Sequence, residues 1–354
     1  MKYLIVNPFG IGDVLFTSGI IREIKEASAQ NRVSYWCNLR VKEILEHNPR
    51  LDRVFALSRG DLKNIHQQSP WLALKEFLKL AAGIKKEHFD ALIDFSLDHR
   101  YCLLAKILGI KKRVGFNYKN RGRFLTEKIE ISSYDKQHIV DYYLKILEIL
   151  NIRPRSKDLE IFTSDKDNKT AGHIFSKNNI GDTDIVIGIA AGAGASWGKD
   201  ASLKRWPAIK YAQICDKISE DCRAKIILLG DKSEKPIADV ICAAMKNKPI
   251  DLTGKLGLGE LVAVIKKLTM LITNDGGPLH IAVANNIKTV SIFGPVDEKV
   301  YGPYPVSPKH AVITAEVSCR PCYRNFKMPP CDKDRQCIYS IDSQTVFQAV
   351  RRQL

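Results

Sequence analysis

Residues 2–15 read KYLIVNPFGIGDVL, and the order of these residues decides the fold class. Residues 3–6 form an apolar run typical of a strand buried in a parallel sheet, and residues 14–27 repeat apolar positions at helical spacing. The turn between them begins Gly10-Ile-Gly12, as a dinucleotide-binding turn does, but Leu15 stands where such a turn has its third glycine. Asp13 also places a negative charge where a pyrophosphate would bind. This first turn is therefore predicted to serve something other than phosphate binding.

The first half of the chain continues to alternate strands and helices. Strands are predicted at residues 3–6, 33–36, 54–57, 91–95 and 113–116, and helices at residues 14–27, 41–47, 71–86, 101–108 and 138–150. Such alternation predicts a parallel sheet with helices on both faces. Residues 151–167, which contain Pro154 and many charges, are the predicted linker.

The same alternation restarts after the linker. Strands are predicted at residues 185–189, 225–229, 270–273 and 289–293, and helices at residues 206–220, 235–245, 258–267 and 277–285. The predicted fold class is therefore α/β, with two doubly wound domains at residues 1–160 and 161–354 that face each other across a cleft. A single dehydrogenase with a catalytic domain is the alternative, although its glycine fingerprint is missing.

The composition of the chain limits the location and the partners that are expected for it. The 354 residues are 45% hydrophobic, yet no apolar run approaches the roughly 18 residues that a membrane span needs. The N-terminus is a poor signal peptide, so a cytoplasmic location is expected. The formal net charge of +16 favours an anionic partner, such as nucleic acid, an anionic membrane or a phosphorylated substrate. A generally basic, solvated surface explains that charge equally well.

The clearest ligand loop is TNDGGPLH at residues 273–280, between a predicted strand and a predicted helix. Gly276 and Gly277 permit close backbone approach, and Pro278 suits the first helical turn. The free N–H groups at such a helix start attract anions. The alternative is that Asn274 or Asp275 only caps the helix.

Two further segments follow strand ends in the second half. AAGAGAS at residues 190–196 precedes KRWP at residues 204–207, where Lys204 and Arg205 have the charge to hold a diphosphate. A solvated helix start with Trp206 as a core anchor is the alternative. Glu234 follows the next strand and suits ribose hydroxyls, although an exposed helix-start carboxylate explains it equally well.

The ordered set of motifs resembles glycosyltransferase family 9, the ADP-heptose:lipopolysaccharide heptosyltransferases and their relatives. The motifs are GDVLFT at 12–17, KRWP at 204–207, DLTG at 251–254, LGE at 258–260, TNDGGPLH at 273–280 and FGPVD at 293–297. The resemblance extends from about residue 3 to about residue 340. It implies a GT-B fold of two Rossmann-like domains, in which the first binds the acceptor and the second binds the sugar nucleotide.

The resemblance also implies roles for individual residues. Asp13 would be the general base for a direct, inverting displacement, with Gly12 on the acceptor side. The diphosphate and its phosphate site would be held by Lys204, Arg205, Asp275, Gly276, Gly277 and His280, with Glu234 as a weaker candidate for the ribose. Fixed donors would stabilise the leaving nucleotide, so no catalytic metal or other cofactor is expected. Relatives commonly carry Ser or Thr where this chain has Gly276.

The implied function is a metal-independent transfer of heptose from ADP-heptose to an anionic, lipid-linked acceptor of lipopolysaccharide type. The enzyme would work as a peripheral protein at the cytoplasmic face of the inner membrane. A sugar-nucleotide epimerase of similar fold and a basic nucleic-acid-binding protein are the alternatives, although no nucleic-acid motif is present.

The loop YKNRGRF at residues 118–124 interleaves aromatic and basic residues. Lys119, Arg121 and Arg123 are candidates for the phosphates or carboxylates of the acceptor. The same pattern is compatible with single-stranded nucleic acid or with a solvated loop.

Four cysteines lie close together near the C-terminus, at Cys319, Cys322, Cys331 and Cys337. A CxxC pair with two further cysteines is compatible with a structural zinc. Free thiols packed in the C-terminal loop, or an occasional disulfide, are favoured over zinc.

Overall fold

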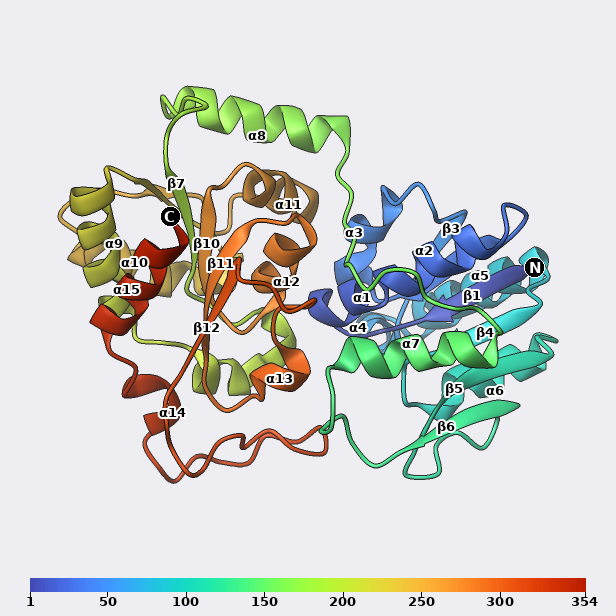
Figure 1. Cartoon of the computed structure of the whole chain (residues 1–354). Helices are drawn as coiled ribbons and strands as arrows, with labels where there is room; N and C mark the ends of the chain where they lie inside the picture. Colours follow the sequence, from blue (N-terminus) through green and yellow to red (C-terminus); the bar gives the residue numbers. More distant parts are fainter. The chain divides into compact units, whose positions relative to one another are not determined.

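The computed structural model describes residues 1–354 except for the side chains of Ala195, Ser196 and Lys199, and it divides the chain into two compact units (Figure 1). Unit 1 is Met1–Phe162 and unit 2 is Thr163–Leu354. Each unit has its own six-stranded sheet, and all strands within each sheet are parallel. No helix in the described part of the chain has both the length and the hydropathy to span a bilayer.

Unit 1 has the strand order β3-β2-β1-β4-β5-β6. Its strands are β1 (Lys2–Val6), β2 (Arg32–Cys37), β3 (Arg53–Ala56), β4 (Ala91–Asp94), β5 (Lys112–Tyr118) and β6 (Glu127–Ile131). Its helices are α1 (Ile11–Phe16), α2 (Ser18–Ala27), η1 (Leu39–Val41), α3 (Lys42–Glu46), α4 (Arg59–Gln68), α5 (Pro70–Glu87), α6 (His99–Ile107) and α7 (Ile139–Ile149). Because side chains alternate along a strand, Leu4 and Val6 of β1 share one face of the sheet. That face packs against Leu80 and Ile84 of α5 and Cys102 of α6.

Unit 2 repeats this order as β12-β11-β10-β7-β8-β9. Its strands are β7 (Val186–Ala190), β8 (Lys225–Leu228), β9 (Ile250–Asp251), β10 (Met270–Asn274), β11 (Lys288–Phe293) and β12 (His310–Thr314). Its helices are α8 (Asp165–Lys177), η2 (Ala195–Lys204), α9 (Ala208–Cys222), η3 (Lys232–Glu234), α10 (Lys235–Ala244), α11 (Leu258–Lys266), α12 (Gly277–Ala284), α13 (Glu298–Tyr301), α14 (Gln336–Tyr339) and α15 (Ser343–Gln353). Ile187 and Ile189 of β7 belong to the core that also contains Ile214 of α9, Ile241 of α10 and Phe347 of α15.

The two strand orders locate the ligand ends of the sheets. In each unit the chain winds outward in both directions from a central pair of strands, β1 with β4 in unit 1 and β7 with β10 in unit 2. Ligands of doubly wound sheets bind at the carboxyl ends of the strands on either side of this switch point. In unit 1 the segment with Asp13 follows the carboxyl end of β1. In unit 2 the segment that begins with Asp275 follows the carboxyl end of β10.

The sequence missed several elements of the fold. β6, β9, β12, α4 and α8 were not predicted, and the predicted linker at residues 151–167 includes the start of α8. The predicted helix at residues 14–27 is instead two helices, α1 and α2, which meet at Thr17. The Thr17 hydroxyl bonds to the Val14 carbonyl oxygen at 2.7 Å and to the buried Tyr35 hydroxyl at 2.6 Å, which explains the interruption.

Candidate active site

A buried ion pair joins two of the predicted donor-site residues in unit 2. The Nζ of Lys204 lies 2.7 Å from the Oδ2 of Asp275, and the Lys204 side chain is only 2% exposed. Lys204 closes the 3-10 helix η2, whereas Asp275 follows the central strand β10. The ammonium also lies 3.9 Å from the ring centroid of Trp197, close enough for a cation–π contact. A buried charge of this kind is stable only when it is paired, so Asp275 holds Lys204 at the carboxyl edge of the sheet.

The start of α12 has the backbone expected for an anion site. Gly276 is the N-terminal cap, Gly277 is the first helical residue and Pro278 lies in the first turn. The first N–H groups of any helix have no partner within the helix, and its dipole is positive at this end. His280 lies in the same helix and is buried. The predicted residues at 275–280 therefore converge with Lys204 on one helix start.

The side chain of Asn274 braces this edge of the sheet, a role that the sequence did not reveal. Its Nδ2 donates to the carbonyl oxygens of Ala191 and Gly192 at 2.7 and 3.0 Å. Its Oδ1 accepts from the backbone N–H of Trp206 at 3.1 Å and from the Tyr211 hydroxyl at 2.9 Å. Asn274 thus ties the glycine-alanine loop to the KRWP segment and fixes Lys204 relative to α12.

Glu234 is buried at the carboxyl ends of β7 and β8 and completes the capping box at the start of η3. The alternative of a helix-start carboxylate is therefore correct in position, but the exposure that it assumed is wrong. The Oε1 of Glu234 accepts from the N–H of Gly194, and its Oε2 accepts from the N–H of Asp231, both at 3.1 Å. Burial raises the pKa of this carboxyl above its usual range. A Cβ at Gly192 would lie only 1.7 Å from Glu234 Oε1, so the glycine is what admits the carboxylate.

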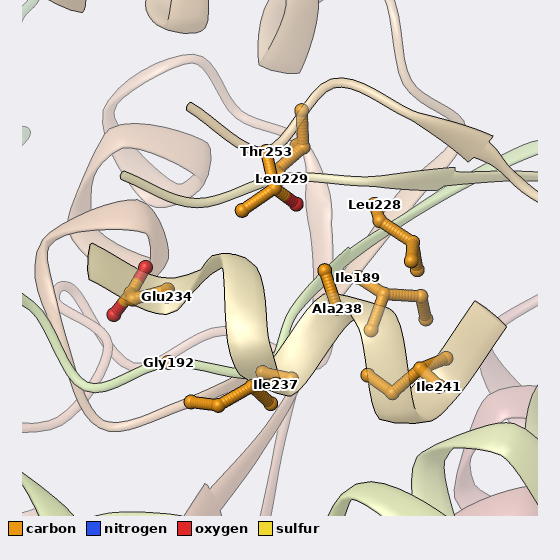
Figure 2. A pocket seen from close by; sticks show the side chains of 10 residues that line it. Ile189, Gly192, Leu228, Leu229, Glu234, Ile237, Ala238, Ile241 and Thr253 are labelled. Carbon is orange, nitrogen blue, oxygen red and sulfur yellow. The ribbon is translucent and has the colours of Figure 1, made fainter. Parts of the chain in front are cut away.

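A small pocket next to Glu234 is otherwise lined mainly by apolar side chains, including Leu228, Ile237 and Ile241 (Figure 2). Its volume is about 10 Å³, which is room for about one water molecule. A nucleobase does not fit in such a volume. The polar side chains that line this pocket are those of Glu234 and Thr253.

Arg205 is the second predicted cation of the donor site. Its Nε is buried and has no hydrogen-bond partner within the described part of the chain. Its positive charge partly offsets the rise in the pKa of Glu234 that burial causes. Arg205 therefore lies near both Glu234 and its neighbour Lys204, and its guanidinium has hydrogen-bonding capacity that an anionic ligand would satisfy.

Asp13 lies inside the first helix of unit 1, not in the loop before it. Helix α1 begins after Gly10, and the Oδ2 of Asp13 accepts from the Gly10 backbone N–H at 3.2 Å. The Asn7 side chain donates to the carbonyl oxygen of Asp13 at 2.9 Å. Gly12 occupies the position before Asp13 in the same turn. The carboxylate is half-buried at the carboxyl edge of the sheet, where the strand β1 ends.

Two buried tyrosines, Tyr35 and Tyr134, lie near enough to Asp13 to feel its charge. Burial is the main cause that raises the pKa of both Tyr35 and Tyr134, and the negative charge of Asp13 adds to it in each case. His138 caps α7 by accepting from the Val140 N–H, and its ring meets Phe16 edge-on at 5.3 Å. These contacts give His138 a structural role at the edge where Asp13 lies.

Asp94 is a buried carboxyl at the same sheet edge that sequence analysis missed. It ends β4, the strand paired with β1, and burial raises its pKa. Its Oδ1 accepts from the Ser96 N–H at 2.8 Å and its Oδ2 accepts from the Cys102 thiol at 2.9 Å. Asp94 therefore shapes the turn after β4, where Leu97 has a φ of 55°. The sequence signal that could have pointed to Asp94 is an acidic residue at the end of an apolar run.

The basic loop at residues 118–124 follows β5 at this edge too. Lys119 Nζ lies 4.9 Å from the Tyr118 ring centroid, and the guanidinium of Arg123 lies 4.9 Å from that of Phe124. Arg121 also lies against Tyr118, at 5.8 Å. The buried Asn117 accepts from the Gly122 N–H at 2.8 Å and so folds the loop back. In unit 1 the structure thus places Asp13 and the three cations on one edge of the sheet.

The four C-terminal cysteines are close enough to influence one another electrostatically. Burial is the main cause that raises the pKa of Cys322, and burial likewise raises that of Cys337 to about 11, with smaller contributions from the neighbouring thiols. All four are free thiols. Among the described residues, no three His, Cys, Asp or Glu side chains are arranged to hold a metal ion. Cys319, Cys322 and Cys331 lie in the segment between β12 and α14, where Cys331 is exposed, and the buried Cys337 lies in α14.

Comparison with known proteins identifies the chain's relatives. The family model of glycosyltransferase family 9 (heptosyltransferase) matches residues 77–331. The lipooligosaccharide heptosyltransferase 2 of a Campylobacter jejuni strain is 26% identical, over 99% of both chains. The lipopolysaccharide heptosyltransferase 1 of Campylobacter coli is 23% identical, over 83% of this chain and 84% of the relative.

Solved structures share the fold. A family 9 glycosyltransferase from Veillonella parvula superposes with a TM-score of 0.84 at 22% identity, over 99% of this chain and 96% of the other. The ADP-heptose lipopolysaccharide heptosyltransferase II of E. coli superposes with a TM-score of 0.76 at 19% identity, over 100% and 98%. The heptosyltransferase WaaC of E. coli, solved with ADP, has a TM-score of 0.75 at 16% identity and is covered completely. These similarities confirm the predicted α/β fold of GT-B type.

Proposed function

The chain belongs to glycosyltransferase family 9, and from this premise we propose that it transfers heptose from ADP-heptose to an anionic, lipid-linked acceptor of lipopolysaccharide type. Membership of the family makes it a glycosyltransferase. The names of its relatives support heptose as the sugar, and the structure of a relative with ADP supports an adenosine diphosphate donor. The observation in this chain that carries the proposal is the buried Lys204–Asp275 pair at the start of α12.

The donor site is proposed to lie in unit 2. The diphosphate would lie at the start of α12, where it would accept from the N–H groups of Gly276 and Gly277 and pair with the ammonium of Lys204. Asp275 keeps the ammonium in place before the donor arrives, so little reorganisation is needed when charge develops on the leaving ADP. Arg205 would add a guanidinium to the same diphosphate. His280 would support the helix start from within α12.

Glu234 is proposed to accept a hydrogen bond from a ribose hydroxyl of the donor. Each of its oxygens already accepts one backbone N–H, and a carboxylate oxygen has a second lone pair to offer. Because burial raises its pKa, the carboxyl would be fully ionised only when the surrounding donors compensate the charge. A ribose hydroxyl is one such donor.

Asp13 in unit 1 is proposed as the general base. The oxygen of the acceptor hydroxyl attacks the anomeric carbon, its proton passes to the Asp13 carboxylate, and ADP leaves with the electron pair of the bond that breaks. A single displacement of this kind inverts the anomeric configuration. The cations and N–H groups of unit 2 would neutralise the leaving diphosphate, so the reaction would need no metal. Gly12, Lys119, Arg121 and Arg123 would contact the acceptor and its anionic groups.

The proposed location is the cytoplasmic face of the inner membrane, because the donor is a soluble nucleotide and the acceptor is anchored in lipid. The net charge of +16 supports attraction to anionic lipid.

Product analysis tests the proposed function. Purified protein would be incubated with ADP-heptose, with and without a soluble, delipidated acceptor saccharide and with a chelator in one arm. The expected result is release of ADP and heptosylated saccharide in equal amounts, only when the acceptor is present and regardless of the chelator, with an inverted anomeric signal by NMR. Conversion of ADP-heptose into another nucleotide sugar without acceptor would instead indicate an epimerase.

A further inference from the structure

The helix α5 exposes a row of large apolar side chains. Trp71, Leu74 and Leu78 are 81%, 47% and 55% exposed. At about 100° per residue they lie within about 60° of one another around the helix. The outward face of a helix on a globular protein is normally polar, so this row indicates a partner.

The opposite side of α5 already forms the core of unit 1. Ala73, Leu80 and Ile84 are buried, and Leu80 and Ile84 belong to the same cluster as Leu4 and Val6 of β1. The exposed row is therefore additional to the face that folding requires. A helix with two apolar faces buries one in the protein and has the other available for an external surface.

Four lysines lie within or beside the exposed row. Lys75, Lys79, Lys85 and Lys86 are all exposed and lie within about 80° of Trp71 around the helix. The two carboxylates of α5, Glu76 and Glu87, lie roughly 140–160° from Trp71, and both are half-buried. We call the side formed by Trp71, Leu74, Leu78 and these four lysines the α5 face. Along α5, which is described throughout, this face has apolar and cationic side chains and no carboxylate.

We propose that the α5 face docks the protein on an anionic lipid bilayer. An apolar row with a tryptophan, flanked by lysines, is the composition of helices that lie in the interface of a membrane. Tryptophan favours the level of the headgroups, and the long lysine side chains reach anionic phosphates while their methylene stems remain in apolar surroundings. The docking rests on the proposed function, because a lipid-linked acceptor brings the reaction to a membrane.

The orientation of α5 within unit 1 fits this role. At its C-terminal end, the Glu87 carbonyl oxygen accepts from Lys2 Nζ at 2.8 Å, and the Glu87 carboxylate pairs with Arg53 at 2.6 Å. Lys2 and Arg53 begin β1 and β3, so this end lies at the amino edge of the sheet. The 18 residues of α5 extend about 27 Å, longer than any strand of the unit. Trp71 at the other end therefore points toward the carboxyl edge, where Asp13 and the basic loop lie.

Charge argues against a second copy of this chain as the occupant. In a two-fold symmetric dimer the α5 face would meet itself and bring two sets of four lysines together. Like charges in contact oppose association, whereas an anionic bilayer complements the same lysines. The bilayer is therefore the partner that this face fits.

Vesicle binding tests the proposal directly. The full chain would be co-floated with vesicles of phosphatidylglycerol and phosphatidylcholine, and with vesicles of phosphatidylcholine alone. We expect binding to the anionic vesicles, a loss of at least about tenfold in W71S/L78S, and a loss of about fivefold per lysine in K75Q/K79Q. Ile107→Ser is the matched control, because Ile107 of α6 is 71% exposed but lies outside the α5 face; its binding should stay within twofold of wild type.

Fluorescence adds a readout at the helix itself. Of the four tryptophans, Trp36 and Trp206 are buried, and Trp197 is half-buried in unit 2 under Lys204. A blue shift of emission on adding anionic vesicles should therefore come chiefly from Trp71, 81% exposed, and the part due to docking should disappear in Trp71→Phe. Equal vesicle binding by wild type and W71S/L78S would overturn the proposal. A wild-type dimer that becomes monomeric in W71S/L78S by sedimentation would also overturn it, in favour of self-association.

The proposed function and the proposed docking surface can be contradicted independently of each other. W71S/L78S should transfer heptose to the soluble acceptor saccharide at the wild-type rate, and it should lose rate only on acceptor embedded in anionic vesicles. Vesicle binding by a wild-type chain that transfers nothing to the soluble acceptor would contradict the proposed function and leave the docking surface standing. Normal transfer with no vesicle binding would contradict the docking surface alone.

Discussion

At the scale of single residues, the Lys204–Asp275 pair has two roles, and substitutions test them separately. It places an ammonium at the start of α12, and it keeps two buried charges compensated. Replacing Lys204 by Met should weaken binding of ADP about 30-fold or more, since a charge-assisted hydrogen bond contributes about 2 kcal/mol. It should also lower the free energy of unfolding by about 3 kcal/mol, because Asp275 is left buried without its counterion. Calorimetric titration and urea unfolding measure the two effects.

The double variant K204M/D275L is the control for that experiment. Removing both charges should restore most of the free energy of unfolding, since no uncompensated carboxylate remains. Affinity for ADP should stay low. Recovery of affinity along with stability would mean that Lys204 acts on the donor only through the fold.

Gly276 offers a second test at the residue scale. A Cβ at this position would lie 3.6 Å from the backbone of Ala193, an ordinary contact, and the extended φ of 176° suits any residue. Gly276→Ser should therefore leave the free energy of unfolding within about 0.5 kcal/mol of wild type. If the hydroxyl donates to the donor phosphate, ADP binding should tighten about threefold or more. Gly276→Ala is the matched control, and equal affinities of the two variants would exclude a hydroxyl contact.

At the scale of elements, the junction of β11 and β12 makes stability depend on pH. The ring of His310 lies 3.0 Å from the Thr289 hydroxyl, and burial, aided by the charge of Lys309, lowers its pKa to about 4. In the unfolded chain the pKa is about 6.5, so unfolding takes up a proton between these two values. Stability is therefore fully present above pH 6.5 and is lost as the pH falls toward 4, by at most about 1.4 kcal/mol per pH unit.

His310→Gln isolates that contribution. Urea unfolding between pH 4 and pH 7 should give a flatter dependence on pH in this variant than in wild type, since glutamine does not titrate. His66→Gln, at an exposed histidine of α4, should leave the dependence as in wild type. Parallel curves for wild type and His310→Gln would show that His310 titrates normally in the folded chain.

Elements that lie in the sheet centre were predictable, and those that depend on tertiary contacts were not. The apolar runs of β1, β4, β7 and β10 are buried on both faces, so hydrophobicity alone reveals them. Strand β6 reads EKIEI and is largely exposed at a sheet edge, so it has no comparable signal. Helix α4 has no fully buried residue, and it packs against α5. The break between α1 and α2 at Thr17 depends on the hydrogen bond between the hydroxyls of Thr17 and Tyr35, and Tyr35 lies in the strand β2.

The same distinction holds for the candidate site. Glycines, cations and carboxylates after strand ends were recognisable because their chemistry is local, as with Gly276, Lys204 and Glu234. The pairing of Lys204 with Asp275 and the bracing by Asn274 join segments that are far apart in the sequence, so no local pattern encodes them. Asp94 was missed because a strand-ending aspartate has many structural uses.

At the scale of the whole molecule, the proposed account divides the work between the two units. In this proposal unit 2 would hold the donor through Lys204 and the start of α12, and unit 1 would contribute the base Asp13 and the cations of the basic loop. This division explains why the first turn lacks a dinucleotide fingerprint. A carboxylate at α1 does not interfere with phosphate binding when the phosphate site belongs to the other unit.

Asp13→Asn tests this division most directly. Asparagine keeps the size of the side chain and an oxygen to accept the Gly10 N–H, but it does not take up a proton at neutral pH. Transfer from ADP-heptose to the soluble acceptor and binding of ADP would be measured on the same preparations of wild type and variant. The account predicts that transfer falls at least about 100-fold while the Kd for ADP stays within twofold. Transfer near the wild-type rate, or a loss of ADP binding equal to the loss of transfer, would contradict it.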